Sequence, residues 1–135
     1  MNNLDLYSEL QQIRARLEAI EHTQEVLVRA EAETILSQIW EIMDADDILA
    51  RVYLLVDGKR TQKDIVEALT SQGIPGGSQP SVSRRLDILQ QDLHLIEVID
   101  HTRAGKVYKH TALERILSIA RKLERRRANG VSKSR

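Results

Sequence analysis

The sequence predicts a mainly helical α+β fold, in which several amphipathic helices accompany one small two-stranded sheet. Apolar residues recur at intervals of three and four along most of the chain, which is the period of a helix with one buried face. Residues 95–111 differ, because two short β-prone runs flank a polar turn there. With 41% hydrophobic and 30% charged residues, the 135-residue chain suits one folded domain with an appended helix.

A long N-terminal helix is expected over residues 1–43, since no glycine or proline occurs before Gly58. Apolar side chains alternate there at spacings of four and three, which is the seam of a coiled coil, and Gln24 is a polar residue on it. A lone helix cannot bury such a seam, so a second copy of the chain or the C-terminal helix must cover it. We expect a homodimer. The stripe shifts after Ala30, which suggests that the helix then packs on the next domain. The predicted dimerisation residues are Leu6, Leu10, Ile13, Leu17, Ile20 and Leu27.

Residues 44–111 are expected to form the next domain. A first helix is capped by Asp44 or Asp46 and stops at Gly58. A second helix opens at Thr61, where T-x-x-D can form a capping box with Asp64.

A third helix, over residues 78–93, follows the turn Pro75-Gly76-Gly77. Pro80 lies in its first turn, where the missing N–H costs nothing. Its apolar positions 82, 86, 89 and 93 predict one buried face, and the remainder is polar. Short hydrogen-bonding side chains and two arginines near a helix N-terminus can reach base edges and phosphates in the major groove of DNA.

A hairpin is expected next, with strands at 95–100 and 106–111 around the turn 101–105. Its tip is basic, because Arg103 and Lys106 project from it. A hairpin with such a tip can lie along the DNA backbone or in the minor groove.

This order of elements resembles the winged helix-turn-helix transcription regulators, especially the MarR-like type. The matching stretches are GKRTQKDIVEAL at 58–69, SQPSVSRRLDIL at 78–89, LI at 95–96 and DHTRAGKVYKHT at 100–111. The resemblance covers about half of the chain. It implies a dimeric, sequence-specific regulator that binds double-stranded DNA, with helix 78–93 in the major groove and the wing 100–111 on the backbone or minor groove.

The predicted DNA-binding residues come from the two helices and the wing. Those expected at or near bases are Gln79, Ser81, Arg84 and Arg85, with Ser78 at the helix start. Those expected at phosphates are Thr61, Gln62, Lys63 and Ser83, and those of the wing are Arg103 and Lys106.

The formal charge of zero hides two opposite halves. Residues 1–57 hold 12 acidic and 4 basic side chains, whereas residues 58–135 hold 8 acidic and 16 basic ones. The basic half contains the predicted DNA-binding elements, as a local electrostatic footprint requires. The alternative is that this asymmetry merely keeps the helices soluble.

A C-terminal helix is expected over residues 112–128, followed by a disordered basic tail at 129–135. The terminal helices of MarR-like proteins form the dimer interface, and the resemblance implies the same here. The arginines at 125–127 suit either the negative end of a helix or extra phosphate contacts.

Other function classes find little support. Cysteine is absent, and no nucleophile and base stand out, so we expect no enzyme and no cofactor. The spacing of His94, His101 and His110 does not place them on one helix face, so we expect no metal. No long apolar run or leader sequence is apparent, which predicts a cytoplasmic protein without membrane contact. The chain has only four aromatic residues, and proteins that bind single-stranded nucleic acid stack its bases on aromatic side chains. Duplex DNA is therefore favoured over a single strand.

Two alternatives remain open from the sequence. One is a winged-helix adaptor that binds proteins through its acidic coiled coil, and the other is an architectural protein that coats DNA with little sequence preference.

Overall fold

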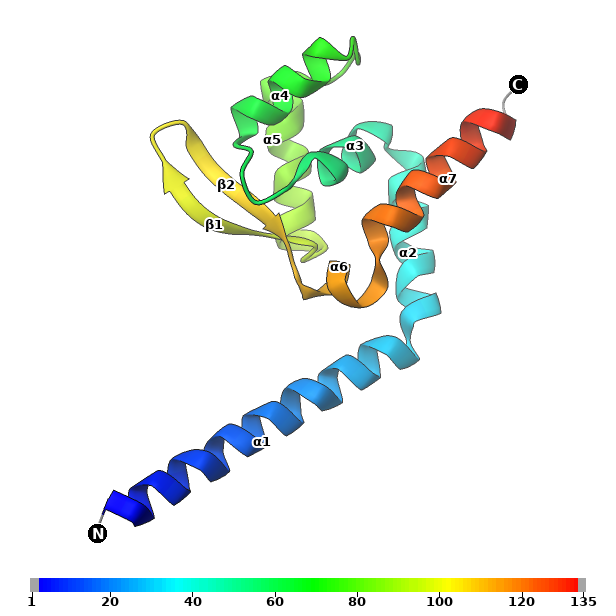
Figure 1. Cartoon of the computed structure of the whole chain (residues 1–135). Coiled ribbons are helices and arrows are strands. Elements are labelled where there is room, and N and C mark those ends of the chain that lie inside the picture. The colour runs from blue at the N-terminus through cyan, green and yellow to red at the C-terminus, as the bar shows by residue number, and fades with distance from the viewer. Residues whose placement is uncertain (1–2, 134–135) are drawn as a thin grey trace. The chain divides into compact units, whose positions relative to one another are not determined.

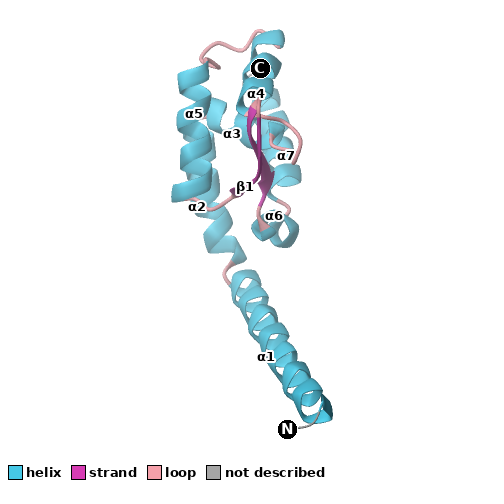
Figure 2. Ribbon diagram, turned by 90° about the vertical axis from the view of Figure 1, so that its left-hand side faces the viewer, coloured by secondary structure: helices cyan, strands magenta, loops and turns pink. Residues whose placement is uncertain are grey.

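A computed structural model describes residues 3–133 and confirms a mainly helical α+β fold with one small antiparallel sheet (Figure 1 and Figure 2). The elements in chain order are α1 (Asn3–Ala30), α2 (Ala32–Ala45), α3 (Asp47–Leu55), α4 (Gln62–Ser71), α5 (Gln79–Asp87), the π-helical turn η1 (Ile88–Asp92), β1 (Ile96–Thr102), β2 (Gly105–His110), α6 (Ala112–Leu117) and α7 (Ile119–Lys133). No helix among these is both long and apolar enough to cross a lipid bilayer.

The predicted single helix over residues 1–43 is wrong, because the chain contains two helices interrupted at Glu31. The residues up to Ile35 form one compact unit and those from Leu36 onward form a second. The interruption coincides with the shift of the apolar stripe. In α1 the seam residues are exposed, whereas Ile39 and Met43 of α2 are buried in the second unit.

The core of the second unit lies among α3, α4, α5 and the start of the hairpin. Its fully buried side chains include Val52, Tyr53, Ile65, Leu69, Val82, Leu86, Leu89, Leu95 and Ile96. Two predicted caps are confirmed. Asp46 accepts from the Leu49 amide at 3.1 Å to begin α3, and Thr61 and Asp64 form the capping box of α4.

The turn between α4 and α5 brings the backbone at Gly77 against the core. A Cβ atom at this position would lie 2.8 Å from Cβ of the buried Leu69, closer than two carbon atoms can approach without rearrangement. Because the neighbour is itself packed, the strain must be taken up by a shift of the turn or of α4.

We therefore expect Gly77→Ala to lower the free energy of unfolding by about 1–3 kcal/mol, the usual effect of overpacking a core. Chemical denaturation measures this change. Ser78→Ala is the control, since Ser78 is exposed and its side chain makes no capping hydrogen bond. Equal stabilities of the two variants would contradict the close packing of Gly77.

The predicted helix over residues 78–93 is present as α5 followed by η1, with Pro80 in the first turn. The hairpin is present, but its turn is shorter than the predicted 101–105, because the strands extend to Thr102 and Gly105 and are joined at Arg103 and Ala104. A bulge lies between Val98 and Asp100. The bridge between Thr61 and Val107 fixes the hairpin beside the start of α4.

The predicted C-terminal helix and disordered tail are both corrected by the structure. Ser118 adopts a left-handed backbone conformation, with φ of 52°, and divides the segment into α6 and α7. The Glu114 carboxylate stabilises this break by accepting from the Ala120 amide at 2.7 Å. Helix α7 then continues to Lys133, through most of the segment expected to be disordered, and residues 134–135 lie outside the described chain.

Candidate nucleic-acid interface

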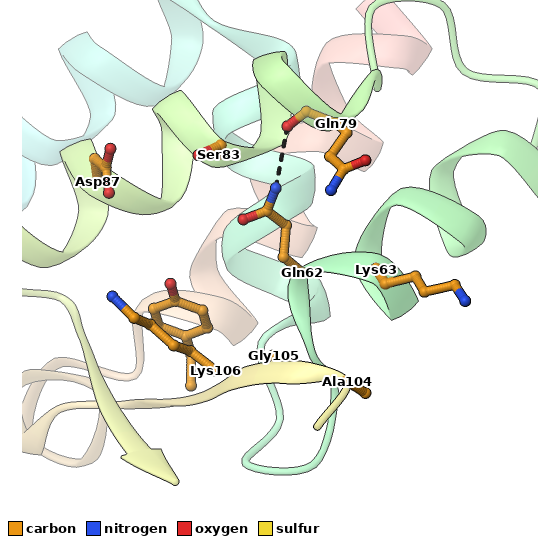
Figure 3. A pocket seen from close by; sticks show the side chains of 9 residues that line it. Gln62, Lys63, Gln79, Ser83, Asp87, Ala104, Gly105 and Lys106 are labelled. Atoms are coloured by element: carbon orange, nitrogen blue, oxygen red, sulfur yellow. Dashed lines mark hydrogen bonds between the residues drawn. The ribbon is translucent and has the colours of Figure 1, made fainter. Parts of the chain in front are cut away.

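A groove of about 440 Å³ lies between the start of α4, one side of α5 and the hairpin (Figure 3). Its lining residues are Gln62, Lys63, Gln79, Ser83, Asp87, Ala104, Gly105, Lys106 and Tyr108. The Gln62 side-chain amide donates to the Gln79 carbonyl at 3.3 Å, which ties the beginnings of α4 and α5 together. Three elements separated in the sequence therefore share one concave surface, most of whose lining residues carry polar side chains.

Five of the predicted DNA-binding residues line this groove: Gln62, Lys63, Gln79, Ser83 and Lys106. On α5 the lining positions 79, 83 and 87 are four residues apart, so they follow one face of the helix. Figure 3 shows Lys63 pointing outward from the groove. Ser78, Arg84 and Arg103 do not line the groove but are exposed near its edges, at the start and on the outside of α5 and at the hairpin turn.

Arg85 and Ser81 are engaged within the protein, which does not fit their predicted role at the bases. The Arg85 guanidinium pairs with Asp46 at 3.2 Å and donates to the Ser81 hydroxyl at 2.5 Å. The Arg85 side chain is only 21% exposed. Arg85 therefore joins α5 to the residue that caps α3.

Thr61 does not fit its predicted phosphate contact either. It is 5% exposed, and its hydroxyl accepts from the Asp64 amide in the capping box. Its role is to begin α4 and to hold the neighbouring strand β2.

Four basic side chains around the groove are available to a ligand. Within residues 3–133, we find no hydrogen bond or ion pair made by the side chains of Lys63, Arg84, Arg103 or Lys106. Cations without an internal partner keep their full attraction for phosphate. Their clustering around one groove gives that face of the second unit a positive character.

Other basic residues of the second unit are paired with the acidic N-terminal half. Arg126 bonds to Asp44, and Arg127 bonds to Asp47. Arg126 also lies over the Trp40 ring, 4.8 Å from its centroid. The two charged halves of the sequence are thus partly partners of each other, and these two arginines secure α7 to the α2–α3 corner.

The sequence interpretation assigned no role to Asp87 or Tyr108 in the site. Tyr108 is 5% exposed and reaches the groove from β2. Burial raises the pKa of its hydroxyl, and the nearby Asp87 carboxylate raises this pKa further. The four-residue spacing of 79, 83 and 87 is the signal that places Asp87 on the groove face.

A second candidate surface is the seam of α1. The six predicted dimerisation residues are each between 50 and 59% exposed, and Tyr7 and Val26 add further exposed apolar area. A row of large apolar side chains at coiled-coil spacing is a surface suited to another helix.

The histidine at the end of the hairpin has a packing role. His110 stacks on Tyr53 with ring centroids 4.3 Å apart, and its Nε2 lies 2.8 Å from the Tyr53 carbonyl oxygen. It therefore joins the end of β2 to α3. In the described part of the chain, no three His, Asp or Glu residues are grouped as metal ligands would be.

Comparisons with known proteins add no information about the function of this surface. No family model, no curated protein and no solved structure matches the chain. The function must therefore follow from the groove, its unpaired cations and the exposed seam.

Proposed function

We propose that this protein is a homodimeric, sequence-specific regulator of transcription that binds double-stranded DNA. The observation that carries the proposal is the groove at the start of α4 and α5, surrounded by Lys63, Arg84, Arg103 and Lys106, for which we find no internal partners within residues 3–133. In this proposal α4 and α5 form a helix-turn-helix, and β1 and β2 form its wing. The MarR-like resemblance of the sequence implies the same arrangement.

The start of α5 would enter the major groove of DNA. Gln79 and Ser83 offer short donors and acceptors to base edges, and Arg84 can reach a guanine or a phosphate. The Ser78 hydroxyl does not cap α5, so the first amides of that helix remain for a backbone phosphate. Lys63 from α4 and Arg103 and Lys106 from the wing would neutralise phosphates on either side.

The polar character of this face favours DNA over a protein partner. A protein-docking surface is expected to present exposed apolar side chains near its centre. The large exposed hydrophobic residues of the described chain belong to α1, α2 and β1, and none belongs to α5. If the protein were an adaptor, the exposed apolar side chains of α1 would suit a protein partner better than the polar face of α5.

Dimerisation would use the seam of α1. Two copies would bury the same stripe against each other, as a coiled coil requires. Each protomer would then present one α5 to one half-site, and the linked pair would bind a palindromic sequence far better than either half alone.

Selection from a genomic fragment library tests the function directly. The purified protein is incubated with the library at moderate salt, and the retained fragments are sequenced. One enriched palindromic motif is the expected result, and a variant with Lys63, Arg103 and Lys106 all changed to alanine should retain little DNA. Uniform retention would indicate the architectural alternative. Absence of retention would reject DNA binding and favour the adaptor.

Arg84 and Arg85 form a matched pair, because they are adjacent in sequence but differ in their surroundings. Arg84→Ala should weaken binding to the selected DNA by about 1–3 kcal/mol and relax the preference at one base pair per half-site. Arg85→Ala should instead lower the free energy of unfolding by about 1.5–3 kcal/mol, because it removes charged hydrogen bonds to Asp46 and Ser81.

Duplex titrations and thermal melts of both variants separate these effects. The thermal midpoint of Arg84→Ala should equal that of the wild type. If Arg84→Ala loses affinity equally for selected and random duplexes, Arg84 contacts a phosphate and not a base. If Arg85→Ala melts like the wild type, its pairing with Asp46 does not stabilise the fold.

A further inference from the structure

Asp87 is an acidic residue in a surface that otherwise suits an anion. It lies on the same face of α5 as Gln79 and Ser83, two turns after Gln79, and it lines the groove together with Lys106 and Tyr108 from the hairpin (Figure 3). The helix rises about 1.5 Å per residue, so Asp87 lies roughly 12 Å along α5 from Gln79. The groove therefore contains a carboxylate as well as the two lysines Lys63 and Lys106.

No structural role in the fold accounts for this carboxylate. Asp87 is exposed, and within residues 3–133 its side chain makes no hydrogen bond or ion pair, not even with Arg84 one turn before it. It caps no helix, since η1 continues directly from α5.

The carboxylate does act on the groove. Burial is the main reason that the pKa of the Tyr108 hydroxyl is raised, and the negative charge of Asp87 raises this pKa further. An ionised carboxylate only accepts hydrogen bonds, so it repels phosphate oxygens and the acceptor atoms of guanine and thymine. The amino group of cytosine is the major-groove partner that suits it best, because that group donates, whereas adenine places its N7 acceptor beside its own amino donor.

We infer that Asp87 is a specificity-determining residue that accepts a hydrogen bond from a cytosine amino group and disfavours phosphate at its own position on α5. This inference rests on the proposed DNA-binding function. In that arrangement, Lys63, Arg103 and Lys106 hold the backbone while Asp87 excludes registers that place a phosphate or an acceptor edge beside it. The groove then selects sequence by repulsion as well as by attraction.

The test compares Asp87→Asn with Asp92→Asn. Asparagine keeps the size of the aspartate but loses its charge and gains a donor. Asp92 is also exposed, but it lies in η1 and does not line the groove, so its substitution removes the same charge from the same helical segment elsewhere. Each protein is titrated against the selected palindrome, against single-base-pair variants of it and against a random duplex. Thermal melts of all three proteins check the fold.

Asp87→Asn is expected to bind the random duplex several-fold more tightly than the wild type and Asp92→Asn do. It should also lose about 5- to 150-fold of discrimination at one C·G pair per half-site, the value of one good base contact. Unchanged discrimination at every base pair would overturn the inference, whatever happens on random DNA. So would an equal loss of affinity on all duplexes, or the same behaviour in Asp92→Asn.

The two levels of the proposal fail differently. A wild-type protein that forms no saturable complex with any duplex removes the DNA-binding function itself. A wild-type protein that selects a palindrome, while Asp87→Asn selects it with the same preferences, removes only the role of Asp87.

Discussion

Raising the salt concentration from about 50 to 200 mM is expected to weaken the protein–DNA complex by roughly 10³- to 10⁵-fold. The reason is counterion release. A dimer that uses Lys63, Arg103, Lys106 and their neighbours would neutralise on the order of 6–10 phosphates, and each displaces condensed cations from the duplex. Titrations of a labelled duplex across this range of salt measure the slope of log affinity against log salt concentration.

The wing should account for a defined part of that slope. Replacing Arg103 and Lys106 together by alanine should flatten it by about 0.9 for each phosphate that is no longer neutralised, and up to about four phosphates per dimer are affected. Arg121→Ala with Lys122→Ala is the matched control, because it removes the same two charges from the exposed side of α7. A salt-insensitive complex, or equal slopes for the two double variants, would contradict the assignment of the groove.

Replacing Leu17 and Ile20 together by glutamate is expected to give a monomer whose affinity for a palindromic site is about 10²- to 10⁴-fold lower. The two positions are 55% exposed in the single chain and lie on the proposed dimer seam. Charges at the seam prevent its burial, and each half-site then binds without the effective concentration supplied by its linked neighbour.

Sedimentation equilibrium and duplex titration test this together. Ala15→Glu with Ala19→Glu adds the same charges to the opposite side of α1, where both alanines are exposed, and should leave a dimer with normal affinity. A wild-type protein that is monomeric at micromolar concentration would remove the dimer from the proposal. A charged-seam variant that stays dimeric would move the interface elsewhere.

Local features of the fold were predictable because their causes are local. The capping box of Thr61 and Asp64 spans four residues, and the Asp46 cap spans a similar distance, so each is visible in a short window. The apolar positions of α5 likewise define its buried face. These features placed the helices and the hairpin in the correct order.

Several features were missed because the sequence pattern around them does not show their cause. Arg84 and Arg85 look alike in the sequence, and only tertiary packing brings Asp46, 39 positions away, beside one of them. The break at Ser118 lies inside a continuous helical pattern, and its stabilising contact comes from Glu114 only after the chain has turned. The composition of the tail predicts disorder, yet α7 extends to Lys133.

About half of the candidate site was predictable from local sequence patterns. Polar residues on one face of α5 and at the tip of a hairpin can be identified from periodicity, but their meeting in one groove depends on the bridge between Thr61 and Val107. The inward role of Thr61 follows from that bridge together with its capping box. Asp87 was visible as a polar residue, but its lack of an ion pair within residues 3–133 was not.

The ion pairs that hold α7 against the α2–α3 corner should also weaken as the salt concentration rises. Asp44 and Asp47 are 55% and 59% exposed, so mobile ions reach their bonds to Arg126 and Arg127. Exposed pairs of this kind each contribute at most about 1 kcal/mol, whereas the expected loss of DNA affinity corresponds to roughly 4–7 kcal/mol. We therefore expect salt that dissociates the proposed complex only to loosen the terminal helix, so that DNA would be released from a protein that is still folded.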